Sequence, residues 1–273
     1  MNLHQSIILG ILQGLTEFLP ISSSGHLVIF PYLLSWQIPA EDAFIFDVLV
    51  QVATLLAVFT YFWKDLTTIV HSLIVSVLKG QPFSEPLARL GWYMLLASIP
   101  AGFIGLAIKE IIESAFNSPL VSAMFLLVTA ALLLVAEQVG NRDRELQHMD
   151  WKDALWIGFF QALAIFPGIS RSGSTIVGGM TRNLNRASAA RFSFLISIPI
   201  MLAAGLLATL DLVKQPELLN NLPIYLPGFV TAALTGYLTI RWLLSFLTRH
   251  PLYLFSIYCT ILAFITFAIY FRA

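Results

Sequence analysis

Six long apolar stretches constrain this chain more than any other feature of its sequence. A helix needs about 20 consecutive, mainly apolar residues to cross the hydrocarbon core of a bilayer. Stretches of this kind lie at residues 43–63, 90–108, 119–139, 189–211, 222–248 and 252–271. Only 11% of the 273 residues are Asp, Glu, Lys or Arg, whereas a soluble domain carries about 25%. The sequence therefore predicts an all-α polytopic membrane protein with a single membrane domain, residues 1–273.

The charge balance and the cysteine content exclude two other classes of protein. The 15 Lys and Arg residues are matched by 15 Asp and Glu residues, so the formal net charge is zero. Such a chain lacks the basic field that attracts a polyanion, and no nucleic acid partner is expected. Cys259 is the single cysteine, which excludes a small fold held together by disulfides.

Two further apolar segments, residues 3–35 and 154–181, are each interrupted in the middle by Pro, Gly and Ser. The interruptions read FLPISSSGH at 18–26 and FPGISRSGST at 166–175. Irregular backbone at membrane depth is tolerated only where it is buried in protein or lines a wet cavity. We therefore expect two re-entrant hairpins of broken helix whose tips meet near the middle of the membrane. The stretch 66–78 is too short to span and is expected to lie at the interface or to dip in.

The two broken segments are copies of one another. They align without a gap when position 13 is placed on position 161, an offset of 148 residues. Matching pairs include Gln13 with Gln161, Phe18 with Phe166, Ser22 with Ser170 and Gly25 with Gly173. This internal duplication defines repeat one, residues 1–140, and repeat two, residues 150–273. Three predicted crossings separate the copies, and an odd number turns the second copy upside down, which predicts inverted-topology repeats.

Basic residues give an independent prediction of the topology. On the predicted path, one side of the membrane receives Lys64, Lys79, Arg89, Arg142, Arg144, Lys152, Arg182, Arg186, Arg191, Arg241 and Arg249. The other side receives Lys109, Lys214 and Arg272. Because Lys and Arg gather in cytoplasmic loops, we expect the loops 64–89 and 140–152 in the cytoplasm. Both termini and the loop 109–118 are expected outside.

The first broken segment combines an acid, hydroxyl groups and an imidazole. Gln13 and Glu17 are four residues apart and share one face of a helix. A carboxylate within an apolar segment is costly unless it is paired or hydrated, which favours a functional role for Glu17. The residues expected to open the next half-helix, where free N–H groups attract an anion, are Ser22, Ser23, Ser24 and Gly25. His26 follows Ser23 by three residues, so we expect its imidazole to reach that hydroxyl.

The second broken segment places an arginine among small and hydroxyl side chains. A guanidinium binds a phosphate or a carboxylate through two parallel hydrogen bonds. Arg171 lies at the position equivalent to Ser23, so a fixed cation is expected opposite the hydroxyl. The neighbours expected to complete this anion site are Ser170, Ser172, Gly173, Ser174 and Thr175.

This set of side chains fits two different functions. Phosphoryl transfer needs a nucleophile, a proton acceptor and positive charge at the phosphate. A transporter or flippase built from inverted repeats also binds an anion at broken helices near the membrane midplane. The residues alone leave both functions open.

Other polar residues receive weaker assignments. Asp47 and Gln51 are four residues apart and could line the same cavity, although an interfacial position is the simpler interpretation of Asp47. A second acidic group is expected to form a solvated face with neighbouring arginines. It comprises Glu137, Asp143, Glu145, Asp150 and Asp153.

The two motifs resemble those of a known family. QGLTEFLPISSSGH at 13–26 and PGISRSGST at 167–175, together with FDVLVQVAT at 46–54, are similar to the bacterial undecaprenyl pyrophosphate phosphatases, also called bacitracin-resistance proteins. The resemblance implies removal of the terminal phosphate from a C55 polyprenyl diphosphate, which recycles the lipid carrier for peptidoglycan and other envelope polymers. It also implies a multi-pass protein of the cytoplasmic membrane, among membrane lipids, with its site open to the outer, periplasmic face. A divalent cation, Mg²⁺ or Ca²⁺, is implied as cofactor.

The resemblance also implies roles for individual residues. Glu17 becomes the essential acid, Ser23 and His26 the catalytic pair, and Arg171 the phosphate clamp. The family often has glutamate where this chain has Gln13, which can offer a metal only its neutral carbonyl oxygen beside Glu17. Attack by Ser23, by His26 or by water stays open, as do the identity of the metal, the accepted prenyl length and a homodimeric state.

Overall fold

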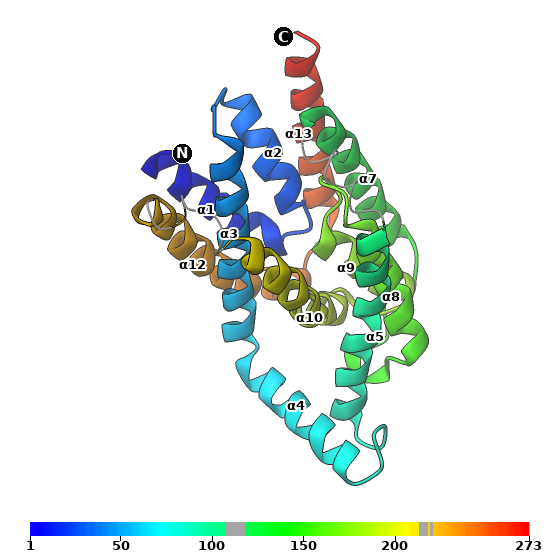
Figure 1. The fold of residues 1–273 in the computed structure, drawn as a ribbon. Coiled ribbons are helices and arrows are strands. Elements are labelled where there is room, and N and C mark those ends of the chain that lie inside the picture. Colours follow the sequence, from blue (N-terminus) through cyan, green and yellow to red (C-terminus); the bar gives the residue numbers. More distant parts are fainter. Residues whose placement is uncertain (108–117, 213–217, 219–220, 273) are drawn as a thin grey trace.

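The computed structural model describes residues 1–107, 118–212, 218 and 221–272 and consists mainly of helices (Figure 1). Six helices in the described part are long and apolar enough to cross a membrane. They are α3 (Ala40–Tyr61), α5 (Pro86–Ala107), α7 (Pro119–Gln138), α10 (Arg186–Leu212), α12 (Leu222–Leu247) and α13 (Tyr253–Tyr270). The prediction of six crossings is confirmed, and the chain is a multi-pass membrane protein. The loop 109–118 lies almost wholly outside the described residues.

Both interrupted segments are pairs of half-helices. The first pair is α1 (Leu3–Phe18) and α2 (Ser23–Leu33). The second pair is α8 (Trp151–Leu163) and α9 (Arg171–Thr181). The half-helices have 11 to 16 residues, which is too short to cross a bilayer at 1.5 Å per residue.

The short stretch 66–78 lies within α4 (Trp63–Leu78), a helix of 16 residues that packs on α5. Figure 1 shows it slanting away from the helices above it. Its apolar residues Val70, Ile74 and Leu78 are exposed. A 3-10 turn, η1 (Leu146–His148), is the further element that precedes α8.

The two repeats share their local structure at the offset of 148 residues. α1 starts with a capping box made by Asn2 and Gln5, and α8 starts with the same device made by Asp150 and Asp153. Ser22 caps α2 by accepting a hydrogen bond from the Gly25 amide at 3.3 Å. Ser170 caps α9 by accepting from the Gly173 amide at 3.0 Å. The sequence alignment therefore pairs residues that do the same structural work.

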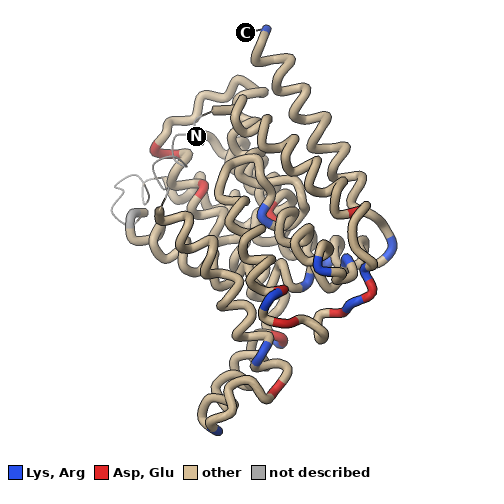
Figure 2. The backbone as a smooth tube through the Cα atoms, turned by 90° about the vertical axis from the view of Figure 1, so that its right-hand side faces the viewer, with Lys and Arg blue, Asp and Glu red and all other residues tan. Residues whose placement is uncertain are grey.

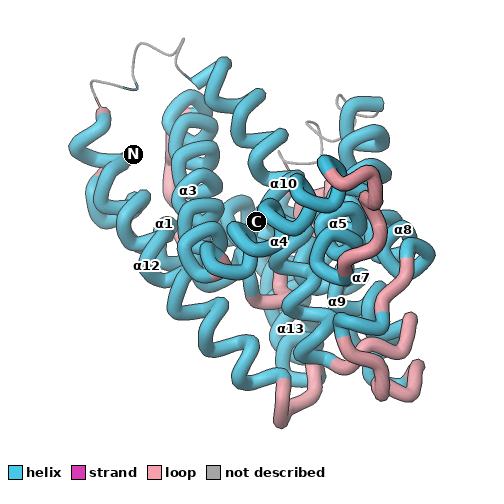
Figure 3. Tube along the Cα trace, turned by 90° about the horizontal axis from the view of Figure 1, so that it is seen from below, coloured by secondary structure: helices cyan, strands magenta, loops and turns pink. Residues whose placement is uncertain are grey.

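The helices also pack reciprocally. α1 lies against α12 as α8 lies against α5, while α3 packs on α10 and α7 packs on α13. Figure 3 shows α1, α3 and α12 grouped on one side and α5, α7, α8 and α9 on the other. In chain order α1, α3, α5 and α7 of the first repeat correspond to α8, α10, α12 and α13 of the second. Exchanging corresponding helices leaves these pairings unchanged, as expected for two copies related by a twofold axis. Three spanning helices separate the broken segments, and the inverted orientation stays a prediction.

Close approach of backbones explains glycines at equivalent positions. A Cβ atom at Gly10 would lie 2.2 Å from the Gly228 carbonyl oxygen on α12. At Gly158, the equivalent residue, it would lie 2.6 Å from the Ala97 oxygen on α5. Small residues are needed at both contacts because the helices have nothing between their backbones.

The tips of the two broken segments touch, as predicted. The Ser22 hydroxyl accepts a hydrogen bond from the Gly168 amide at 3.1 Å, and the Ser172 hydroxyl donates to the Leu19 carbonyl at 2.9 Å. Thr129 on α7 braces the second break by donating to the Gly168 carbonyl at 2.8 Å and accepting from the Ser170 amide at 3.0 Å. The irregular backbone is therefore satisfied inside the protein rather than by lipid.

The expected solvated acidic face is wrong for two of its members. The Glu137 side chain is 1% exposed and accepts hydrogen bonds from Arg186 at 2.5 and 2.8 Å. Asp153 is fully buried and accepts from Arg144 and Arg182, each at 2.7 Å. These acids join helix ends and loops, and their arginine partners balance the cost of burial.

Charge is unevenly distributed along the molecule. Figure 2 shows most Lys and Arg residues of the described part in the lower half of the molecule. Both chain ends lie toward the opposite end of the molecule from α4 (Figure 1). This distribution agrees with the predicted separation of basic loops from termini.

Candidate active site

A cavity of about 290 Å³ lies where the two broken segments meet. Its polar wall comprises Glu17, Ser22, Ser23, Ser24, Gln51, Ser170 and Arg171. Its apolar wall comprises Ala164, Ile165, Ile169, Ile200, Met201 and Ala204. The cavity thus has both a polar and an apolar lining. It lies at the end of α1 and the beginnings of α2 and α9.

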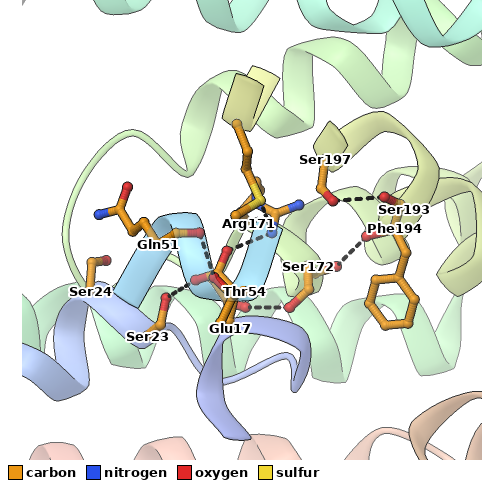
Figure 4. Close-up of polar contacts among 12 residues, drawn as sticks. Glu17, Ser23, Ser24, Gln51, Thr54, Arg171, Ser172, Ser193, Phe194 and Ser197 are labelled. Carbon is orange, nitrogen blue, oxygen red and sulfur yellow. Dashed lines mark hydrogen bonds and ion pairs between the residues drawn. The ribbon is translucent and has the colours of Figure 1, made fainter. Parts of the chain in front are cut away.

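Glu17 is the centre of the polar wall (Figure 4). One carboxylate oxygen accepts a hydrogen bond from the Arg171 guanidinium at 2.7 Å. The other accepts from the Ser23 hydroxyl at 2.5 Å and from the Gln13 amide at 3.0 Å. The Glu17 side chain is 10% exposed, so this carboxylate needs the cation and the donors that surround it.

The Ser23–Glu17 hydrogen bond has the geometry of a nucleophile and its base. Ser23 is the first residue of α2, and Glu17 lies in the last turn of α1. A carboxylate that already accepts the hydroxyl hydrogen bond is placed to take the proton when the oxygen attacks.

Arg171 brings positive charge from the second repeat. It is the first residue of α9, and one terminal nitrogen contacts Glu17 as well as the Met201 sulfur at 3.6 Å. Its other terminal nitrogen is buried and has no hydrogen-bond partner among the described residues. A buried guanidinium nitrogen without an acceptor is a position at which an anion could bind.

His26 does not reach Ser23, so the expected Ser23–His26 contact is wrong. The imidazole is fully buried, outside the cavity lining, with Nδ1 2.6 Å from the Ser22 carbonyl oxygen and Nε2 2.8 Å from the Tyr258 hydroxyl. The His26 ring contacts the carbonyl of Ser22, the N-cap residue of α2. The Ser23 hydroxyl donates to the Glu17 carboxylate instead. Tyr258 lies 232 residues away on α13, and no sequence pattern connects it to the site.

The chain matches a family model described as "Bacitracin resistance protein BacA" over residues 6–265. The chain belongs to this family. A protein named undecaprenyl-diphosphatase from Methanosphaera stadtmanae is 40% identical over 97% of each chain. Proteins with the same name from Chlorobaculum tepidum and Myxococcus xanthus are 41% and 40% identical, over 96% and 94% of this chain and 95% and 86% of their own.

In this BacA-family protein, the remaining predicted anion-binding residues divide into two groups. Ser22, Ser24 and Ser170 line the cavity. Ser172, Gly173, Ser174 and Thr175 do not line it, nor does Gly25. Gly25 instead allows the two breaks to touch, since a Cβ atom there would lie 2.9 Å from the Gly168 Cα. Thr175 is hydrogen-bonded to the Ser193 hydroxyl at 2.6 Å.

α3 contributes one of the two weaker candidates. Gln51 lines the cavity, whereas Asp47 does not. The four-residue spacing placed both on one side of α3, but only Gln51 is level with the breaks.

Two oxygen-bearing side chains, Glu17 and Gln13, are the candidates to hold a divalent cation, and of the two only Glu17 lines the cavity. No group of three or more His, Cys, Asp or Glu side chains gathers in the described part of the chain. The Gln13 carbonyl oxygen is buried without a hydrogen-bond partner in that same part, and its amide nitrogen lies 3.0 Å from Glu17. Mg²⁺ commonly binds one or two protein oxygens and completes its shell with water and phosphate. A carboxylate beside a free amide oxygen suits that mode.

Proposed function

We propose that this chain is an undecaprenyl-diphosphatase, which converts undecaprenyl (C55) diphosphate and water to undecaprenyl phosphate and inorganic phosphate. The relatives described above carry that name, and this chain matches them over nearly their full length. The observation that carries the proposal is the contact of Ser23, Glu17 and Arg171 within one cavity. In the cell, this activity recycles the lipid carrier for peptidoglycan synthesis and confers resistance to bacitracin.

The proposed mechanism has two steps. In the first, the Ser23 oxygen attacks the terminal phosphorus while Glu17 accepts the hydroxyl proton. A serine–phosphorus bond forms, the bridging phosphorus–oxygen bond breaks, and undecaprenyl phosphate leaves. In the second, water attacks the phosphoserine, the serine–phosphorus bond breaks, and Glu17 returns its proton to the Ser23 oxygen. The water oxygen leaves as part of inorganic phosphate, and the remaining water proton passes to phosphate or solvent. Arg171 neutralises the charge that develops on the phosphoryl oxygens in both steps.

The protein groups also suggest how proton and charge are shared. Glu17 already accepts from Ser23 and Arg171, so substrate phosphate must share Arg171 with it. The free terminal nitrogen of Arg171 allows this without breaking the ion pair. Direct attack by water, with Glu17 as base, is the alternative that the same geometry permits.

A divalent cation, Mg²⁺ or Ca²⁺, is part of the proposal. Glu17 and the Gln13 carbonyl oxygen are the residues that would hold it. When bound, the ion would neutralise phosphate charge and help to orient the diphosphate.

The residues that line the cavity support a substrate with a polar head and an apolar tail. The diphosphate belongs at the polar wall, and the first prenyl units belong against Ile165, Met201 and Ala204. Ala204 is also exposed on the surface of α10, which gives the chain a way out to membrane lipid. The membership in the family supports a place in the bacterial cytoplasmic membrane with the cavity open to the periplasmic face, and the basic loops support an orientation with those loops in the cytoplasm.

Phosphate release from a polyprenyl diphosphate by purified protein tests the proposal. Wild-type protein is expected to release phosphate, to lose activity with a chelator and to regain it with Mg²⁺ or Ca²⁺. Ser23→Ala is expected to lose nearly all turnover while still binding lipid diphosphate, because the Arg171 clamp remains. Ser245→Ala is the control, because this serine lies on α12 and does not line the cavity. Substantial hydrolysis by Ser23→Ala would transfer attack to water, and lipid movement without hydrolysis would replace the phosphatase with a transporter or flippase.

A further inference from the structure

The residue before Ser23 has an unusual backbone. Ser22 has a φ of 69° and a ψ of 99°, a backbone conformation that residues other than glycine rarely adopt. Such a conformation costs free energy and persists only where its surroundings impose it. Because Ser22 is the N-cap of α2, its backbone decides where the Ser23 hydroxyl points.

The Ser22 side chain is fixed by three neighbours, one of which is the Ser24 hydroxyl at 3.3 Å. The Ser22 hydroxyl accepts from the Gly25 amide at 3.3 Å and from the Gly168 amide at 3.1 Å. These contacts fix the hydroxyl between the two breaks, but they leave the Ser22 carbonyl to be held by other groups.

That carbonyl accepts two hydrogen bonds from His26, one from the backbone amide at 3.2 Å and one from the imidazole. Tyr258 in turn holds the imidazole. A carbonyl oxygen only accepts, so His26 Nδ1 carries the proton and donates it to Ser22 at 2.6 Å. In the neutral imidazole, Nε2 then accepts from the Tyr258 hydroxyl at 2.8 Å. The two rings are stacked, with centroids 5.6 Å apart and planes inclined by 5°. Phe30 stacks on His26 at 5.7 Å, so the imidazole is fixed in position and orientation.

Neither residue lines the cavity. The imidazole is fully buried, and both of its nitrogens are engaged, so it has no free atom for a substrate or a proton from Ser23. Its influence on the chemistry must pass through the Ser22 backbone.

We propose that His26 and Tyr258 are positioning residues that hold the Ser22 carbonyl and thereby aim the Ser23 hydroxyl at Glu17. The inference rests on the proposed function, and it changes the role of the histidine from proton acceptor to brace. Tyr258 links the site to α13, which otherwise stands outside the catalytic machinery.

Substitution of His26 by an amide and by an apolar side chain separates a brace from a base. The Asn side-chain nitrogen takes the place of Nδ1 and can donate to the Ser22 carbonyl, although it cannot act as a base. His26→Asn is therefore expected to keep kcat within roughly tenfold of wild type, the size of one neutral hydrogen bond. His26→Leu removes the donor and is expected to lose on the order of 100-fold in kcat with little change in KM. A dead His26→Asn protein that folds normally would overturn the proposal.

Tyr258→Phe removes the hydroxyl and keeps the ring, so it tests the brace without opening a cavity. It is expected to lower kcat roughly fivefold, again the size of one hydrogen bond. Tyr270→Phe is the matched control, because this tyrosine lies on the same helix with nearly the same exposure, 38% against 37%. No change in Tyr258→Phe, or an equal change in Tyr270→Phe, would contradict the role of Tyr258.

The double variant decides whether the two residues act through one path. Tyr258→Phe is expected to have no further effect in the His26→Leu background, because its hydroxyl acts through the imidazole. Additive losses would overturn the pairing. Thermal unfolding of each variant separates loss of fold from loss of aim. If active wild-type protein tolerates His26→Leu, the positioning role fails while the phosphatase stands; if wild-type protein releases no phosphate, both proposals fail.

Discussion

Glu17 shows how one side chain can organise a site drawn from two distant parts of the chain. Its carboxylate joins Ser23 six residues later and Arg171 154 residues later. Sequence alone singled out all three residues, because an acid, a hydroxyl and an arginine at breaks in apolar helices demand an explanation. It did not reveal that Glu17, rather than His26, accepts from Ser23, since that choice depends on side-chain direction.

Arg171 is expected to act through its planar fork rather than through charge alone. Arg171→Lys keeps the charge but cannot reach Glu17 and a phosphate with separate nitrogens. We expect kcat/KM to fall by about 10²–10³, the usual cost of losing a transition-state donor, and to approach that of Arg171→Ala. Phosphate release measured on both variants tests this. Near-normal turnover by the lysine variant would defeat the clamp role.

Gln13→Glu is expected to make the site more dependent on its cation. The Gln13 amide donates to Glu17, whereas a second carboxylate would repel it unless a proton or a metal ion lies between them. We expect turnover close to wild type at saturating Mg²⁺ or Ca²⁺, half-saturation at lower metal concentration, and lower residual activity once the metal has been fully removed. Metal titrations of wild type, Gln13→Glu and Gln13→Ala measure this. A folded but inactive Gln13→Glu protein would show that the neutral amide is required.

At the scale of elements, the packing of α1 on α12 depends on the absence of a side chain at Gly14. A Cβ atom there would lie 1.9 Å from the Thr235 hydroxyl oxygen and 2.5 Å from the Ala232 carbonyl oxygen. Gly14→Ala is therefore expected to destabilise by about 1–3 kcal/mol, the usual cost of overpacking.

Gly102→Ala is the control for this prediction, because a Cβ atom at Gly102 on α5 meets nothing within 4 Å. That variant should unfold at the wild-type temperature or slightly above it, since alanine favours helix over glycine by about 1 kcal/mol. Thermal unfolding in detergent compares the two. Equal behaviour of the variants would refute the close-packing account of α1.

The cap of α8 predicts sensitivity to acid. Burial alone would raise the pKa of the Asp153 carboxyl, but hydrogen bonds from Arg144, from the Asp150 amide and from Arg182 outweigh it and lower the pKa. A carboxyl whose pKa is lowered in the folded state stabilises the fold at pH values above its pKa in the unfolded chain, which is about 3.9. That stabilisation is lost as pH falls through the folded-state value.

Asp153→Asn is accordingly expected to be less stable than wild type at neutral pH and to lose less stability on acidification. Unfolding temperatures recorded from about pH 6 down to about pH 2 compare the two proteins, with exposed Asp143→Asn as control. Parallel pH profiles would remove Asp153 from the acid response. The sequence suggested only a solvated cluster here, because burial of a loop acid depends on which distant arginines meet it.

For the whole molecule, apolar length predicted the six crossings, and the Pro, Gly and Ser residues within two further apolar segments predicted the breaks and their contact. These features can be predicted because the bilayer imposes the same two requirements on the whole chain: spanning helices of sufficient apolar length, and irregular backbone that is buried in protein. The position of α4, the bracing by Thr129 and the partnership of Tyr258 with His26 were not predictable, because each depends on the meeting of residues with no shared pattern.

Topology is the prediction that belongs to this scale. A membrane-impermeant thiol reagent applied from outside is expected to label Glu41→Cys at the start of α3 but not Glu145→Cys in the basic loop. Native Cys259 is buried and provides an unlabelled background. Labelling of position 145 alone in intact cells would reverse the orientation.

The ion pair between Glu17 and Arg171 has a consequence for biogenesis. Ribosomes deliver the first repeat well before the second, so the acid enters the bilayer with no guanidinium to meet it. A lone carboxylate in hydrocarbon is neutralised by a proton or kept hydrated. Glu17 of the nascent protein therefore stays protonated or hydrated until α9 is inserted and Arg171 reaches it. Insertion of the second repeat completes the site, and an incomplete chain released early lacks the arginine that would give it activity.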